Sequence, residues 1–104
     1  MIYEHRTYHV LPGKTQKFVE DFERVPKKLL EQHGAQLVGM WTTMLGGQSN
    51  EIVYILGWES LDHLGRGWSA IYGEESMVAY LQEGARVDHV DNKILRPVPY
   101  SPLQ

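Results

Sequence analysis

The sequence predicts an α+β domain built on an antiparallel sheet. Four segments are rich in β-branched and aromatic residues, and two stretches between them show the apolar spacing of helices. A short, turn-rich link joins the second and third strand segments, which indicates antiparallel pairing because a parallel crossover needs a dozen residues or more. A chain of 104 residues is long enough for one core and one domain.

The first half of the chain predicts a strand, a broken helix and a second strand. Residues 2–10 favour a strand, and Leu11-Pro12-Gly13 ends it because proline and glycine suit a tight turn. Residues 14–33 predict a long helix that Pro26 interrupts, since proline removes a helical hydrogen bond. The second strand is expected over 35–44. The apolar stripe of the helix recurs at spacings of 4, 3 and 4, at Phe18, Phe22, Val25 and Leu29.

The second half repeats this order. Glycine and polar residues at 46–50 predict a turn into a strand over 51–58. Ser60 is a suitable N-cap for a helix, and a shorter helix is expected over 74–84. A final, more polar strand covers 87–96. The order strand-helix-strand-strand-helix-strand is the ferredoxin-like arrangement, with the helices on one face of a four-stranded antiparallel sheet.

The third strand is apolar on both faces, which predicts a partner for the sheet. Alternate residues of this strand point to opposite faces of the sheet. Val53 and Ile55 point to one face, and a set of four apolar residues points to the other. The helices can bury only one face, so we expect a second copy of the chain to cover the other, giving a homodimer or a higher oligomer. The alternative is that the tail or a loop covers that face. The set that points the other way is Ile52, Tyr54, Leu56 and Trp58.

Composition and charge exclude several classes of function. The net charge of -3 and the scattered Lys and Arg residues give no basis for nucleic-acid binding. The chain has no cysteine, no apolar run long enough for a membrane span and no secretory signal at its start, so a cytoplasmic location is predicted. We expect a single domain over 1–97, an extended proline-containing tail over 98–104, and no cofactor.

The first strand carries the most informative polar residues. Glu4, Arg6 and Tyr8 share one face, and the face itself is not decided by the sequence. In a functional interpretation Arg6 holds an anion or carboxylate and Tyr8 donates a hydrogen bond. In a structural interpretation, which we favour, Glu4 and Arg6 form a buried ion pair within a tyrosine network that sets register at a dimer interface.

Aromatic and histidine residues supply the remaining candidates. Four aromatic residues could line an apolar cavity between sheet and helices, although aromatic residues more often fill cores. His5 and His9 stand about 13 Å apart on a strand, too far to share an ion. His89 and Asp91 share a face about 7 Å apart, but a solvent-facing edge explains them better, so no metal site is predicted. The four aromatic candidates are Trp41, Tyr54, Trp58 and Trp68.

Four segments of the chain carry a recognisable pattern: "IYEHRTYHVLPGKTQKFVEDFE", "LVGMWTTMLGG", "NEIVYILGWESLDH" and "NKILRP". In this order and spacing they resemble the NIPSNAP family, which belongs to the dimeric α/β barrel superfamily. His5 stands where the family more often has leucine, and Tyr54 where it often has histidine. The resemblance implies the ferredoxin-like protomer and a pair of sheets forming the dimeric barrel. It implies no reaction, although related barrel families include cofactor-independent monooxygenases, isomerases and haem enzymes.

Three classes of function follow. The first is a homodimer that binds a small, partly apolar ligand in the cleft between sheet and helices. The second is a cofactor-independent monooxygenase or isomerase acting on a small aromatic or polyketide-like substrate, and a scaffold role without ligand is a third. No catalytic residue is assigned, and whether the chain is an enzyme stays open. The candidate ligand-binding residues are His5, Arg6, Tyr8, Trp41, Tyr54, Trp58 and Trp68.

Overall fold

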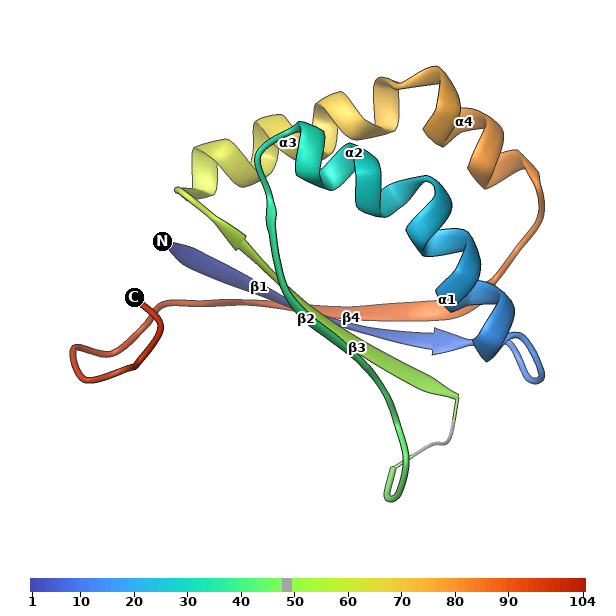
Figure 1. Cartoon of the computed structure of the whole chain (residues 1–104), viewed down its shortest axis with the longest axis horizontal. Helices are drawn as coiled ribbons and strands as arrows, with labels where there is room; N and C mark the ends of the chain where they lie inside the picture. Colours follow the sequence, from blue (N-terminus) through green and yellow to red (C-terminus); the bar gives the residue numbers. More distant parts are fainter. Residues whose placement is uncertain (48–49) are drawn as a thin grey trace.

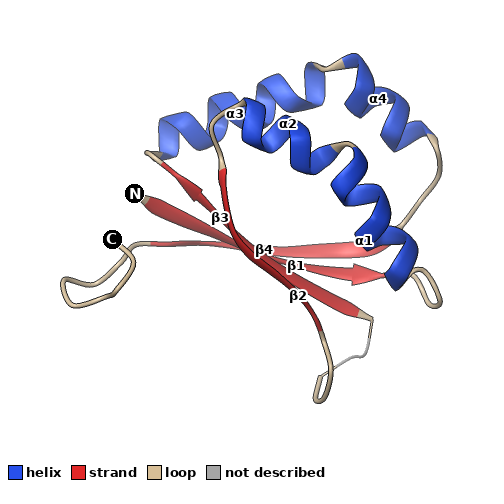
Figure 2. Ribbon diagram, in the orientation of Figure 1, coloured by secondary structure: helices blue, strands red, loops and turns tan. Residues whose placement is uncertain are grey.

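A computed structural model describes residues 1–47 and 50–104 (Figure 1). Four strands in this part of the chain form one antiparallel sheet in the order β2-β3-β1-β4, and the helices lie as one layer over it (Figure 2). This architecture confirms the predicted α+β, ferredoxin-like protomer. The elements are β1 (Ile2–Val10), α1 (Thr15–Arg24), α2 (Pro26–Gln32), β2 (Gln36–Thr42), β3 (Glu51–Trp58), α3 (Leu61–Gly73), α4 (Glu75–Gln82) and β4 (Val87–Leu95).

Both crossovers consist of two helices. The first breaks where expected: α1 ends at Arg24 and α2 begins at Pro26, a first-turn position where the missing N–H of proline costs nothing. In the second, the Ser60 hydroxyl caps α3 by accepting a hydrogen bond from the His63 N–H at 3.0 Å. The longest described helix has 13 residues, and none of the described helices has the length and apolar character needed to cross a bilayer.

Strand alternation determines which side chains face the helices. The even-numbered residues of β1, including Glu4 and Arg6, lie on the helix side together with the fully buried Tyr54 and Trp58 of β3. In β2 the register shifts between Leu37 and Gly39. Two residues predicted in the turn before β3, Gln48 and Ser49, lie outside the described residues.

The C-terminal tail does not extend as predicted. The Ser101 N–H donates to the Val98 carbonyl oxygen at 3.0 Å, so the chain turns, and the Tyr3 hydroxyl donates to the Gln104 carbonyl oxygen at 3.1 Å. The bond from Tyr3 ties the tail to one end of the outer face, the sheet face away from the helices (Figure 1). The tail covers only part of this face, because Trp41 remains 52% exposed.

Candidate functional site

A carboxylate without access to solvent organises the helix side of the sheet. Glu4 on β1 is 1% exposed, and each of its oxygens accepts two hydrogen bonds. Oε1 accepts from the indole N–H groups of Trp58 at 3.0 Å and Trp68 at 2.8 Å. Oε2 accepts from Arg6 Nη1 at 2.9 Å and Asn92 Nδ2 at 2.8 Å. Four donors from β1, β3, α3 and β4 replace the water that the carboxylate lost on burial.

Arg6 extends this hydrogen-bond network along the sheet to two tyrosines. Its Nε donates to the Tyr54 hydroxyl at 2.8 Å and its Nη2 to the Tyr8 hydroxyl at 2.9 Å. The guanidinium also lies 4.6 Å from the centre of the Trp68 ring, a cation–π contact. Burial alone would lower the pKa of Arg6, but Tyr54, Tyr8 and Glu4 outweigh it and raise the pKa, so Arg6 is a permanent cation.

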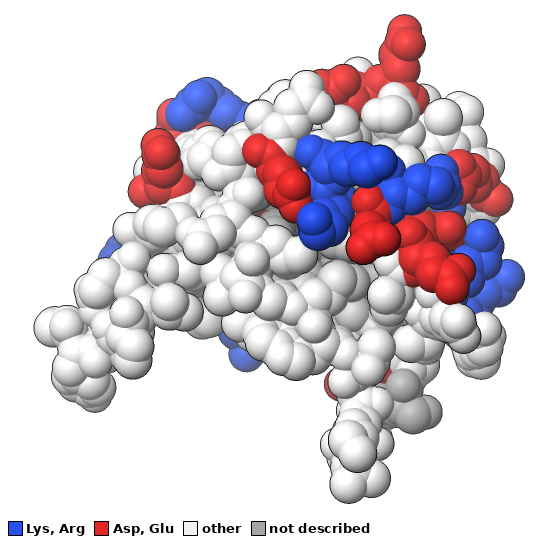
Figure 3. Space-filling model, viewed as in Figure 1, with Lys and Arg blue, Asp and Glu red and all other residues white. Residues whose placement is uncertain are grey.

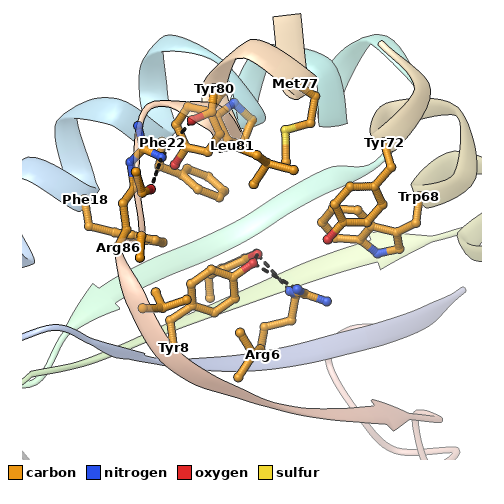
Figure 4. A pocket seen from close by; sticks show the side chains of 16 residues that line it. Arg6, Tyr8, Phe18, Phe22, Trp68, Tyr72, Met77, Tyr80, Leu81 and Arg86 are labelled. Carbon is orange, nitrogen blue, oxygen red and sulfur yellow. Dashed lines mark hydrogen bonds between the residues drawn. The ribbon is translucent and has the colours of Figure 1, made fainter. Parts of the chain in front are cut away.

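Above Arg6 the sheet and helices enclose a cavity of about 280 Å³ (Figure 4). Strands β1 and β3 supply its polar floor, and the helices supply aromatic and aliphatic walls. The floor and wall residues named in the figure all point into this space. The lining comprises Arg6, Tyr8, Phe18, Phe22, Pro26, Tyr54, Trp68, Tyr72, Met77, Tyr80, Leu81, Gly84, Ala85, Arg86, Val87 and Val90.

A second arginine fixes the far wall of the cavity. The Arg86 guanidinium lies 3.8 Å from the centre of the Tyr80 ring, and its Nε donates to Asp21 Oδ2 at 3.1 Å. Burial opposes ionisation of Asp21, but the hydrogen bonds from Arg86 and Lys17 prevail and lower its pKa. Burial raises the pKa of Tyr80 to about 12. At physiological pH this wall therefore combines the Arg86–Asp21 ion pair with the neutral phenol of Tyr80.

The cavity lining lacks a side chain that commonly accepts a proton near neutral pH. Its described residues include no histidine, aspartate, glutamate or cysteine. The titratable groups are two arginines and four tyrosines, and burial raises the pKa of Tyr54, Tyr72 and Tyr80. The arrangement can orient an acceptor atom and exclude water, but it supplies no ordinary general base.

The structure divides the seven ligand-binding candidates into three groups. Arg6, Tyr8, Tyr54 and Trp68 line the cavity together. Trp58 is fully buried beside it and is used as a donor to Glu4. The other two candidates, His5 and Trp41, pair with Ile55 and Val53 on the outer face, so we correct their assignment to this cleft. Their chemical type suits a ligand site, but strand alternation turns them away from the helices.

Sequence reasoning also missed residues that the fold brings to functional positions. Arg86 precedes β4 in a loop, and its place in the cavity wall has no local signal. A cluster of potential metal ligands also lies on the outer face. In it His9, His89 and Asp91 each place one potential ligand atom within 4.8 Å of the others. Spacing along β1 separates His9 from His5, whereas the neighbour of His9 is His89 on the adjacent strand β4.

The fold and cavity define a class of protein: a ferredoxin-like α+β domain with an aromatic cleft between its sheet and its helices. Comparison with known families is more specific, because the NIPSNAP family model matches residues 3–102. The chain belongs to the NIPSNAP family. This finding confirms the resemblance seen in the sequence.

Individual relatives agree with this assignment. The human protein NipSnap homolog 3B is 27% identical over 98% of this chain, and the match covers 41% of that relative, so the chain spans about two-fifths of its length. A crystal structure of a NIPSNAP family protein with unknown function from Agrobacterium tumefaciens is 28% identical, with a TM-score of 0.90 over 100% of this chain and 94% of that one. A solved antibiotic biosynthesis monooxygenase is 10% identical with a TM-score of 0.62, over 95% of this chain and 100% of that one, a likeness of fold alone.

Proposed function

We propose that this NIPSNAP family protein is a homodimer that binds one small, partly apolar ligand in the cavity of each protomer. The observation that carries this proposal is the cavity itself, an aromatic chamber with a polar floor at one end. Its volume of about 280 Å³ lies at the lower end of the range typical of small-molecule sites. A ligand with one ring or a short branched body fits this volume better than a large cofactor does.

The polar floor favours a neutral acceptor oxygen over an anion. Glu4 compensates the charge of Arg6, so the pair presents no net positive charge to the cavity. The Tyr8 hydroxyl oxygen accepts from Arg6 and from the Tyr54 hydroxyl at 3.0 Å, which directs its own proton elsewhere. Among the residues described, none accepts that proton by hydrogen bond. A ketone, ester or amide oxygen of the ligand would take this place.

Binding is tested with small aromatic ketones and with hydrocarbons of the same shape. For the wild type we expect the ketone to bind about 3- to 10-fold more tightly, the value of one hydrogen bond. In Tyr8→Phe the ring remains but the donor is gone, so this preference should disappear. Isothermal titration calorimetry or ligand-observed NMR measures both affinities. An unchanged ketone preference in Tyr8→Phe would contradict the assigned role of Tyr8.

The location of the site is tested by closing the cavity. Ala85 is an exposed residue in the cavity lining, so Ala85→Trp should block ligand binding with little effect on folding. Ala70 on α3 is also exposed but lies outside the lining, so Ala70→Trp is the matched control. Equal binding by wild type, Ala85→Trp and Ala70→Trp would place the ligand elsewhere and refute the cavity proposal.

The homodimer is supported by the apolar character of the outer face. Val53 and Ile55 of β3 lie there with the half-exposed Trp41 of β2, and exposed apolar side chains each forfeit about 1.5–3 kcal/mol of burial. Lys, Arg, Asp and Glu gather over the helix layer, whereas the visible surface of the hairpin and tail carries few charges (Figure 3). A second copy, with the same face, buries both surfaces about a two-fold axis.

We expect the wild type to sediment at twice its 12.0 kDa protomer mass. Trp41→Glu should shift it to the protomer at micromolar concentration, because a carboxylate would be buried between the sheets. Leu61→Glu introduces the same charge at an exposed apolar residue on α3 and should leave the dimer intact. Sedimentation of the wild type as a well-folded protomer would overturn the sheet-pairing proposal.

The lining favours a binding protein over the alternative, a cofactor-independent monooxygenase or isomerase. The fold shared with an antibiotic biosynthesis monooxygenase supports the alternative only at the level of architecture. An isomerase needs a group that exchanges a proton near neutral pH, and the described lining offers only phenols and guanidinium groups. His5, the one histidine among the ligand-binding candidates, lies on the other face of the sheet.

A further inference from the structure

Three potential metal ligands meet on the outer face, across the sheet from the cavity. His9 of β1 and His89 of β4 are direct cross-strand partners, and Asp91 lies two residues further along β4 on the same face. The two imidazole rings stack with centres 3.9 Å apart and planes 13° apart. His9 Nε2 lies 2.8 Å from Asp91 Oδ2. The cluster thus combines His9 with two residues that follow it 80 and 82 positions later in the chain.

The separations in this cluster are close to those a metal ion requires. Tetrahedral ligands at about 2.1 Å from an ion lie about 3.4 Å from one another. One potential ligand atom of each residue lies within 4.8 Å of the others, and His9 Nε2 and Asp91 Oδ2 are 2.8 Å apart. His9 is buried and fixed, whereas the side chains of His89 and Asp91 are 53% and 67% exposed. The two exposed side chains can adjust by rotation, without movement of the strands.

A carboxylate beside His89 favours metal binding through Nε2 of that ring. His89 Nδ1 is 2.9 Å from Asp88 Oδ2. Histidine ligands in metal sites commonly donate their other ring N–H to a carboxylate, which fixes the tautomer and strengthens the ligand.

We propose that His9, His89 and Asp91 bind one divalent transition-metal ion per chain, with Zn²⁺ or Ni²⁺ as the ions of suitable chemistry. Two imidazole nitrogens and one carboxylate oxygen suit these ions better than Ca²⁺ or Mg²⁺, which prefer oxygen ligands. Three protein ligands leave coordination positions that water or a further ligand would fill. This site is separate from the cavity and does not depend on its ligand.

The test uses full-length, untagged protein dialysed against a chelator and then titrated with Zn²⁺ in a calorimeter. We expect saturable binding of one ion per chain, and a visible absorption band when Co²⁺ replaces Zn²⁺. His89→Ala and Asp91→Asn should each weaken Zn²⁺ binding at least about tenfold, since even residues that only support metal ligands change affinity 10- to 100-fold. Both side chains are exposed, so circular dichroism should show an intact fold.

A second histidine–carboxylate pair in the chain provides the control. His33 Nε2 lies 3.1 Å from Glu74 Oε1, a pair that belongs to no described group of three potential metal ligands. His33→Ala should therefore leave Zn²⁺ affinity unchanged. Absence of saturable Zn²⁺ binding by the wild type at micromolar concentration would overturn the proposal. Full affinity in both His89→Ala and Asp91→Asn would also overturn it, because the ion would then bind elsewhere.

Discussion

Glu4→Gln is expected to lower the free energy of unfolding by about 3–5 kcal/mol, the usual cost of breaking a buried ion pair. The glutamine oxygen can still accept from two donors. Its amide NH₂ must then face the other two, either Arg6 Nη1 and Asn92 Nδ2 or the two indoles. In both orientations a donor faces donors, and the buried Arg6 loses its counter-ion. Urea unfolding followed by tryptophan fluorescence measures the loss.

Two further variants make this result specific. Glu4→Gln combined with Arg6→Met removes the unpaired cation, so the double variant should be more stable than Glu4→Gln alone. Glu31→Gln breaks the exposed Lys27–Glu31 pair at 2.6 Å and should leave the unfolding midpoint unchanged, because water solvates both partners. A Glu4→Gln protein as stable as the wild type would show that the four-donor network contributes little.

The second large effect concerns two glycines in one helix. A Cβ at Gly67 of α3 would lie 2.4 Å from Cζ3 of Trp58, a ring that is fully buried. Gly67→Ala must displace this ring and should destabilise the protein by about 1–3 kcal/mol, as overpacked cores do. The displacement also strains the hydrogen bond from Trp58 to Glu4. The measurement is again the free energy of unfolding in urea.

Gly65 provides the matched control, since it lies in the same helix, two residues away. A Cβ at Gly65 meets no atom within 4 Å, so Gly65→Ala should stabilise the protein by about 0.5–1 kcal/mol through helix propensity alone. The two substitutions are chemically identical and should act with opposite signs. Equal effects of both on stability would refute the close contact between Gly67 and Trp58.

The sequence by itself determined the elements of this protein and their order. Apolar spacing and strand propensity act between residues close in the chain, so β1 and β3 have the predicted bounds and the first crossover breaks at Pro26. The Ser60 cap forms for the same reason. The apolar alternate residues of β3 also indicated that Tyr54 and Trp58 share a face, as they do.

Only the tertiary structure decided which of these residues meet. Alternation gives each strand two faces but does not say which one the helices cover, so Arg6 and Tyr54 came together while His5 and Trp41 turned away. The place of Arg86 in the cavity wall depends on a loop. The pairing of His9 with His89 depends on strand register. Register and loop placement minimise the free energy of the whole packed chain, and no short segment of sequence contains that information.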